Sequence, residues 1–319
     1  MSLSSDSAAW SFAHITDIHL GSEKSYRFDP SRNANWATAR KQMEAFRPDL
    51  LLMGGDVTRD GDTHEWEYQM VKDDFASLPI PVFAIPGNQD VGNRHTRVQG
   101  GWDDGRDDLK LNVTSERLSL FASYFGPINS TFVHRNVRFT SFYDAVIGSG
   151  LPEEDRLWHM LESLADQPKV DHHVVVMHYA LFIDALDEPE FDITQKDEYL
   201  PWYFSVSAQH RRRLVDLLKK AGADIIFSGH IHRRRPEMDV EGIRYFQGAA
   251  GGGHAQWPEK WADGDGTLGF YRCDVTKEKI DVTFVPIDPI SDLKSRGQMG
   301  HPPIHMREYP ERGGVDHVS

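Results

Sequence analysis

Short polar motifs recur where apolar segments of this sequence end. They supply carboxylates, an amide oxygen and imidazoles in this order: Asp17-Ile18-His19, Gly55-Asp56, Gly87-Asn88, His178 and Gly229-His230-Ile231-His232. Two aspartates, one asparagine and four histidines exceed what one metal ion takes, but they suit two ions that share a carboxylate. Mixed nitrogen and oxygen ligation favours iron, manganese or zinc over calcium or magnesium. We therefore predict two divalent or trivalent metal ions (Fe, Mn or Zn) as cofactors.

Each motif alone has an ordinary structural explanation. An Asp-x-His pair arises by chance, and a histidine after a strand is more often a satisfied surface or core residue. Asp56, which follows two glycines, could be a turn residue. The functional reading depends on all five motifs falling in order on successive strand ends.

The segments before the motifs must position them. We expect strands at residues 11–16, 49–53 and 81–85, with helices at 33–46 and 63–75 between them. This βαβαβ order predicts a parallel sheet, and open α/β sheets carry their functional groups outside the carboxyl ends of the strands. The motifs that follow these strands should therefore meet at one edge of the sheet.

The second half of the chain again alternates apolar strands with helices. Helices are expected at 115–125, from 152 onward and at 207–221, and strands at 131–134, 137–142, 173–177, 224–227, 243–247, 268–275 and 280–285. The acidic and aromatic stretch 180–204 is expected to be a long loop. Strands on both sides of the middle predict an α/β fold, a four-layer αββα sandwich of two mixed β-sheets packed face to face with helices outside.

The domain boundaries follow from the loss of periodicity. We expect a disordered leader at 1–9, a single domain at 10–289 and a C-terminal tail at 290–319. A polar, Gly-rich insertion at about 92–113 reads as a surface loop, either a functional lid or merely mobile.

Composition limits the partners. The net charge of -14, from 35 Lys+Arg against 49 Asp+Glu, disfavours binding to duplex nucleic acid. No apolar run approaches the length that spans a bilayer. A single cysteine, Cys273, excludes an internal disulfide and fits a reducing, cytoplasmic location. The oligomeric state is not indicated.

The order of the motifs resembles that of the calcineurin-like metallophosphoesterase family over roughly residues 11–285. The sequences around Asn88 and His230 look most similar to the purple-acid-phosphatase-like and complete-protein-phosphatase-like branch. The resemblance implies an enzyme in which a metal-bound hydroxide hydrolyses a small phosphate ester, either a monoester or a diester. It also implies that Asp17, His19 and His232 hold one metal ion, that Asn88, His178 and His230 hold the other, and that Asp56 bridges them.

The departure from the family pattern is Gln89, where the family usually has a proton-donating histidine. An amide donates a hydrogen bond but cannot deliver a proton near neutral pH. The enzyme could act on esters with weakly basic leaving groups, another acid (Asp90, His95 or His254) could substitute, or the site could mainly bind phosphate. We expect an active enzyme, because no ligand position is lost, with Gln89, Asp90 and His95 as candidate catalytic residues.

Candidate substrate contacts are Asn88, Arg233 and His254. Arg233 begins an Arg-Arg-Arg run directly after the last histidine motif, so its guanidinium could reach a phosphate oxygen, or the run could be a solvated loop. Two alternatives remain open. One is a weakly active or non-catalytic module that binds phosphate and metal, and the other is a cyclic-nucleotide or phospholipid phosphodiesterase.

Overall fold

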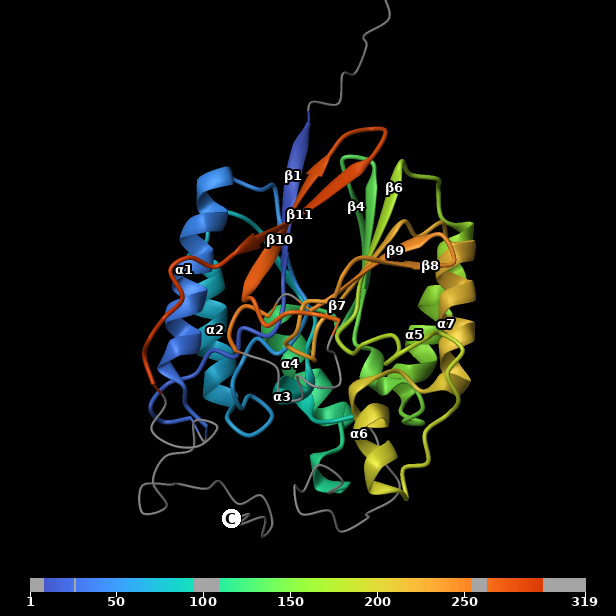
Figure 1. Ribbon diagram of the computed structural model, residues 1–319, viewed down its shortest axis with the longest axis horizontal. Helices are drawn as coiled ribbons and strands as arrows, with labels where there is room; N and C mark the ends of the chain where they lie inside the picture. Colours follow the sequence, from blue (N-terminus) through green and yellow to red (C-terminus); the bar gives the residue numbers. More distant parts are fainter. Residues whose placement is uncertain (1–8, 26, 95–108, 249, 254–262, 295–319) are drawn as a thin grey trace, which may run out of the picture.

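Two mixed β-sheets lie face to face in the computed structural model, which describes residues 9–25, 27–94, 109–248, 250–253 and 263–294 (Figure 1). The outer face of one sheet is covered by α1 (Pro30–Phe46) and α2 (Glu65–Ala76), and that of the other by α5 (Pro152–Ser163) and α7 (Ala208–Lys220). The predicted four-layer αββα sandwich is confirmed.

The first sheet has the strand order β11-β10-β1-β2-β3. Its parallel part consists of β1 (Trp10–Ile15), β2 (Leu51–Met53) and β3 (Val82–Ala84), which are the three strands that precede the first three motifs. The antiparallel strands β10 (Gly269–Val275) and β11 (Ile280–Pro286) extend the sheet on the far side of β1.

The second sheet has the strand order β4-β5-β6-β7-β9-β8. Four strands run parallel in its centre, and an antiparallel strand closes each edge. In sheet order, the strands are β4 (Asn129–His134), β5 (Val137–Phe142), β6 (His172–Val176), β7 (Ile225–Ser228), β9 (Ile243–Gln247) and β8 (Met238–Val240). The carboxyl ends of β6 and β7 lead directly into the last two motifs.

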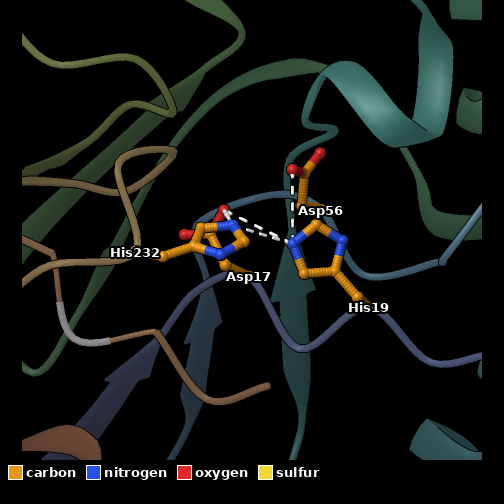
Figure 2. Close-up of side chains that lie close together, drawn as sticks. All are labelled: Asp17, His19, Asp56 and His232. Atoms are coloured by element: carbon orange, nitrogen blue, oxygen red, sulfur yellow. Dashed lines mark hydrogen bonds and ion pairs between the residues drawn. The ribbon is translucent and has the colours of Figure 1, made fainter. Parts of the chain in front are cut away.

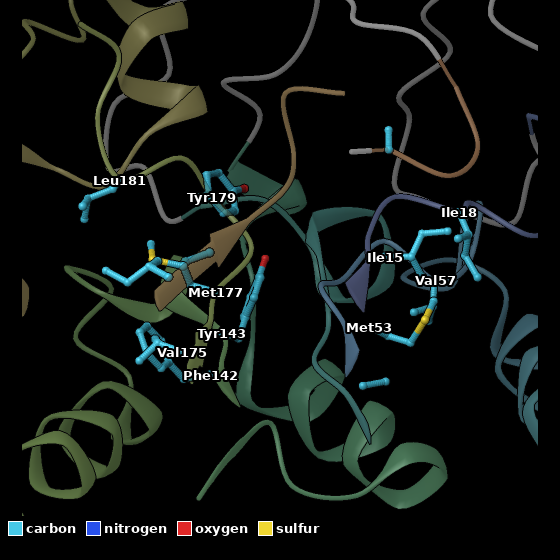
Figure 3. Close-up of a cluster of buried hydrophobic side chains, with 14 of the residues drawn as sticks. Ile15, Ile18, Met53, Val57, Phe142, Tyr143, Val175, Met177, Tyr179 and Leu181 are labelled. Atoms are coloured by element: carbon cyan, nitrogen blue, oxygen red, sulfur yellow. The ribbon is translucent and has the colours of Figure 1, made fainter. Parts of the chain in front are cut away.

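The core is divided by the sheets, because successive side chains of a strand point to opposite faces. Phe12 of β1 packs between the sheets against Phe139, with ring centroids 5.1 Å apart. Figure 3 shows the cores under the helices, with Ile15 and Met53 in the group beside the first sheet. Strands buried on both faces explain why their sequences are continuously apolar.

Helix α1 begins three residues before the predicted start. The carboxylate of Asp29 accepts a hydrogen bond from the Ser31 backbone N at 3.0 Å, and Pro30 occupies the first turn. An aspartate cap followed by proline is a favoured helix start. This start places Arg32 in the first turn of the helix.

The predicted loop at 180–204 is wrong in its last part, which forms α6 (Lys196–Phe204). Pro201 lies inside this helix and argued against a helical prediction. The helix persists because Tyr199, Trp202, Tyr203 and Phe204 are buried in a small core of their own. Tertiary burial of one apolar face outweighs the local penalty. The hairpin strand β8 was not predicted at all.

The domain boundaries stay predictions. Residues 1–8 of the expected leader, 95–108 of the expected insertion and 295–319 of the expected tail lie outside the described residues. The ends of the insertion are joined, since the Asn93 N donates to the Leu111 O at 2.6 Å and the Val113 N to the Asn93 O at 2.8 Å. In the described part of the chain, the helices are too short or too polar to cross a bilayer.

Candidate metal centre

The seven predicted metal ligands all lie just beyond the carboxyl end of a strand. They gather at the end of the sandwich where α3 (Asn88–Val91) and α6 are found (Figure 1). Asp17 and His19 follow β1, Asp56 follows β2, Asn88 follows β3, His178 follows β6, and His230 and His232 follow β7. The structure brings the seven side chains together in two adjoining groups.

The first group contains Asp17, His19, Asp56 and His232, whose potential ligand atoms all lie within 4.8 Å of one another (Figure 2). The His19 Nε2 lies 2.9 Å from the His232 Nε2 and 3.6 Å from the Asp56 Oδ2. The His232 Nε2 lies 3.2 Å from the Asp17 Oδ1. All four side chains are buried, so their polar atoms face one another rather than water.

The second group contains Asp56, His178 and His230, and Asn88 joins it. The His178 Nε2 lies 3.6 Å from the Asp56 Oδ1 and 3.4 Å from the Asn88 Oδ1. Asp56 therefore belongs to both groups, with Oδ2 facing His19 and Oδ1 facing His178. This is the placement that a carboxylate shared by two ions requires.

Neighbouring groups orient these side chains. The His178 Nδ1 lies 2.8 Å from the Gly54 carbonyl oxygen, and donation of its proton there leaves Nε2 with a lone pair for a metal. The Asn88 Nδ2 donates to the Tyr203 Oη at 3.2 Å and to the Asn93 Oδ1 at 3.1 Å. The Asn88 Oδ1, the better ligand atom, is thereby directed at His178.

Five of the seven residues have left-handed backbone conformations. The φ angles are +56° at Asp17, +49° at His19, +51° at Asp56, +69° at His230 and +52° at His232. Side chains other than glycine seldom adopt this region, and such residues cluster at functional sites. The turns after β1, β2 and β7 therefore hold a strained backbone conformation that directs their side chains at one point.

The buried polar atoms of the centre fit metal ions. Among the described residues, the Asp17 Oδ1 and the His230 Nε2 are buried without a hydrogen-bond partner. Burying such atoms unpaired costs free energy that a bound cation would offset. Carboxylates, imidazoles and an amide oxygen in two groups with a shared carboxylate match the predicted pair of ions.

The electrostatics point the same way. Burial raises the pKa of Asp56 to about 8, the carboxyls of Asp17 and Asp90 add to the rise, and His178 opposes it. Burial lowers the pKa of His19 and of His230 well below the usual range. The imidazoles of His19 and His230 are thus in the neutral form that binds metals, and a cation beside Asp56 would favour its ionised form.

Gln89, the predicted departure from the family, lies at the edge of the centre. Its backbone N donates to the Asp56 Oδ1 at 2.8 Å. Its side-chain Oε1 accepts a hydrogen bond from the Arg27 Nη2. Arg27 is itself paired with the buried carboxylate of Asp60, which its Nε meets at 2.7 Å. With Oε1 engaged, the amide NH₂ is the end of Gln89 that remains for a ligand.

Both carboxylate oxygens of Asp90 are occupied by hydrogen bonds from neighbouring turns. Its Oδ1 accepts from the Thr58 N at 2.8 Å and from the Thr58 Oγ1 at 2.5 Å. Its Oδ2 accepts from the Gly87 N at 2.8 Å and from the Val57 N at 3.2 Å. The carboxylate therefore ties the turn after β2 to the turn after β3, and these four donors leave it poorly suited to transfer a proton.

The remaining predicted residues are less informative. The Arg233 Nη2 donates to the Gly264 carbonyl oxygen at 2.5 Å, so its guanidinium is directed at the segment before β10. His95 and His254 lie outside the described residues.

Sequence reasoning missed the arginines beside the centre, whereas the aromatic run at 199–204 was expected either to line the pocket or to pack as core. The guanidinium groups of Arg27, Arg32 and Arg59 all act electrostatically on His19 and lower its pKa. The rings of Tyr203 and Phe204, from α6, lie 5.4 Å and 5.1 Å from the ring of His230. No periodic or motif signal marks the three arginines, apart from the position of Arg59 three residues after Asp56.

Comparison with known proteins identified similar sequences and folds. A family model described as calcineurin-like phosphoesterase matches residues 11–234. The serine/threonine-protein phosphatase CPPED1 of Pongo abelii is 25% identical over 194 residues, covering 59% of this chain and 54% of the relative. The 3',5'-cyclic-nucleotide phosphodiesterase alr5338 of Nostoc sp. is 39% identical over 112 residues, covering 34% of this chain and 38% of the relative.

A solved structure shares the fold. The purple acid phosphatase PPD1 from yellow lupin (Lupinus luteus) seeds superimposes with a TM-score of 0.56 at 13% identity, covering 90% of this chain and 53% of that chain. The alignments to the curated CPPED1 relatives span about half (54%) of the length of those proteins.

Proposed function

Because the chain belongs to the calcineurin-like phosphoesterase family, we propose that it is a metal-dependent phosphoesterase with a dinuclear centre. Asp17, His19 and His232 would hold one ion, and Asn88, His178 and His230 the other, with Asp56 shared between them. The observation that carries the proposal is the shared carboxylate, whose two oxygens face His19 and His178 at 3.6 Å each. When bound, two such ions supply positive charge to a phosphoryl group and acidify a water molecule.

The protein's own contribution is orientation of the ligands. The Thr16 Oγ1 donates to the Asp17 Oδ2 at 2.8 Å, and the His230 backbone N donates to the same oxygen at 3.0 Å. Asp17 thereby keeps Oδ1 directed at His232. Burial excludes bulk water from these contacts, which strengthens each electrostatic interaction inside the site.

Gln89 would act as a hydrogen-bond donor rather than as a general acid. Arg27 holds its Oε1, so the NH₂ group is available to an ester oxygen of the substrate. Such a donor stabilises negative charge on a departing oxygen without transferring a proton. The proposed enzyme therefore favours esters whose leaving group is a weak base, such as aryl phosphates.

Two other functions have specific support. Similarity to the Nostoc cyclic-nucleotide phosphodiesterase favours diester hydrolysis, and it is concentrated in about a third (34%) of this chain. The presence of Gln89 in place of the expected proton donor supports a non-catalytic role in binding phosphate or metal.

Metal reconstitution followed by a substrate panel tests the proposal. The purified protein is loaded with iron, manganese or zinc, and bound metal is counted. Aryl and alkyl phosphomonoesters, bis-aryl diesters, cyclic nucleotides and a phosphoserine peptide are then assayed. Binding of two ions with turnover of an aryl ester supports the proposal. Metal binding without turnover of any ester, under any metal condition, would establish the non-catalytic alternative.

A further inference from the structure

Arg32 is a charged residue beside the centre that the metal assignment leaves without a role. It lies in the first turn of α1, where its backbone N donates to the Asp29 O at 3.1 Å. The residue as a whole is half-buried, but its Nε and Nη1 atoms are closed off from solvent. Within the described segments of the chain, neither atom has a hydrogen-bond partner.

This lack of a partner separates Arg32 from other arginines of the protein. Arg27 pairs with Asp60, the Arg40 Nη1 meets the Asp74 Oδ1 at 2.7 Å, and the buried Arg211 meets the Glu188 Oε1 at 3.0 Å. Asp29 is close to Arg32 in sequence, but its Oδ1 accepts from the Ser31 N at 3.0 Å and from the Ser31 Oγ at 2.6 Å as the helix cap.

The guanidinium is held beside the first group of ligands. A Cβ built on Gly253 would lie 2.7 Å from the Arg32 Cζ, so the guanidinium packs directly on the Gly253 backbone. The preceding Gly252 N donates to the Asp17 O at 3.0 Å, which fixes this glycine segment to the turn that carries Asp17. Arg32 is also the strongest charged influence on His19, and its charge is felt by Asp17 and Asp56.

Asp29, Asp17 and Asp56 favour the charged form of Arg32 electrostatically, but buried Nε and Nη1 donors without a hydrogen-bond acceptor are costly and call for an anion. Binding of two metal ions would increase this need, because the positive charge of the two ions would then exceed the negative charge of the two carboxylates. The substrate class proposed above supplies a suitable anion, since phosphate oxygens accept the charge-assisted hydrogen bonds that guanidinium groups donate.

We propose that Arg32 binds a non-bridging oxygen of the substrate's phosphoryl group and thereby makes the site selective for phosphomonoesters. A monoester dianion has three non-bridging oxygens, so one remains for Arg32 when two face the metal ions. A diester has two, and its second ester substituent occupies the position of the third. This inference rests on the proposed function and narrows it to monoesters.

Equilibrium binding of inorganic phosphate tests the inference independently of turnover. Calorimetric titrations compare the wild-type protein with Arg32→Met and Arg32→Lys, each with its metal content measured, in metal-loaded and metal-free forms. Arg40→Met is the matched control, because Arg40 lies on the same helix but pairs with Asp74. We expect Arg32→Met to lose about tenfold to a hundredfold in phosphate affinity, Arg32→Lys to lose less, and Arg40→Met to be unchanged.

Two further measurements separate this inference from its premise. In wild type, kcat/KM for an aryl monoester should exceed that for a bis-aryl diester. Arg32→Met should reduce kcat/KM for the monoester at least tenfold more than it reduces kcat/KM for the diester. The metal-free Arg32→Met protein should melt at no lower temperature than wild type, because it loses an unpaired buried charge. Phosphate affinity within twofold of wild type in a folded Arg32→Met protein would overturn the role of Arg32. If the wild type turns over no ester, the proposed function fails, while the affinity comparison still decides the role of Arg32.

Discussion

Replacement of Gln89 by histidine is the sharpest test of whether this site lacks a proton donor for the leaving group. The substitution introduces an imidazole at the position from which the amide NH₂ is available to the substrate. Alkyl esters need a proton on the departing oxygen, whereas aryl esters need it far less. We therefore expect Gln89→His to raise kcat/KM for an alkyl phosphate and to leave that for an aryl phosphate nearly unchanged.

The structure sets the size of this gain below that of an optimised general acid. Such an acid contributes about 10²–10⁴-fold. Here Asp90, the natural partner for the new imidazole, already accepts four hydrogen bonds from Thr58, Val57 and Gly87. Arg27, which now holds the Gln89 Oε1, would lie beside the imidazole and lower its pKa. We expect a gain of roughly tenfold to a hundredfold, largest at acidic pH, where more of the imidazole is protonated.

The assay is kcat/KM for alkyl and aryl phosphates between pH 5 and 8, with metal content measured for each protein. Gln89→Ala is the matched control, since it removes the amide without supplying an acid and should reduce activity on both substrates. Arg27→Met in the histidine background should extend the gain toward neutral pH. An alkyl-to-aryl ratio that does not change in Gln89→His at any pH would refute the argument that this site lacks a proton donor.

Three other substitutions probe the centre. Asp56→Asn should abolish binding of two ions, with loss of at least a hundredfold in turnover. Because burial raises the pKa of Asp56 from 3.8 to about 8, the metal-free wild type should lose stability as the pH rises through this window. Denaturant titrations at pH 5 and 8 should show a smaller loss of unfolding free energy in Asp56→Asn than in wild type. Gly253→Ala should weaken phosphate binding as Arg32→Met does, because its Cβ would lie 2.7 Å from the Arg32 Cζ; unchanged affinity would contradict the packing. Tyr203→Phe removes the hydroxyl that meets the Asn88 Nδ2 at 3.2 Å. Metal titration should then show about a tenfold loss of affinity for one ion, and unchanged affinity would contradict the proposal that Tyr203 orients Asn88.

The gathering of the candidate ligands was predictable because parallel strands place their carboxyl ends at the same edge. Asp17, Asp56 and His178 each follow a short apolar run, and this pattern is visible in the sequence without any knowledge of tertiary structure. The layered fold followed from the same runs, since strands buried on both faces lack polar alternation.

The surroundings of the centre could not be predicted in this way. Arg32 reaches the centre because it packs on Gly253, whose neighbour Gly252 is bonded to the Asp17 backbone, and no periodicity encodes that packing. Tyr203 reaches His230 because α6 forms despite Pro201. Arg211, on the helix after α6, is fully buried and paired with Glu188, although three consecutive arginines suggest an exposed face. Each of these contacts depends on long-range packing rather than on local pattern.

The left-handed turns at the ligand positions set the stability of the fold against the placement of the candidate ligands. Holding a non-glycine residue there costs on the order of 1 kcal/mol or more at each position, and five candidate ligands are so placed. Glycine at any of these positions would relieve that strain. Replacement of any one of these five residues by glycine should therefore make the metal-free protein more stable while removing a candidate ligand. In this protein, stability and ligand placement are in conflict at the same five backbone positions.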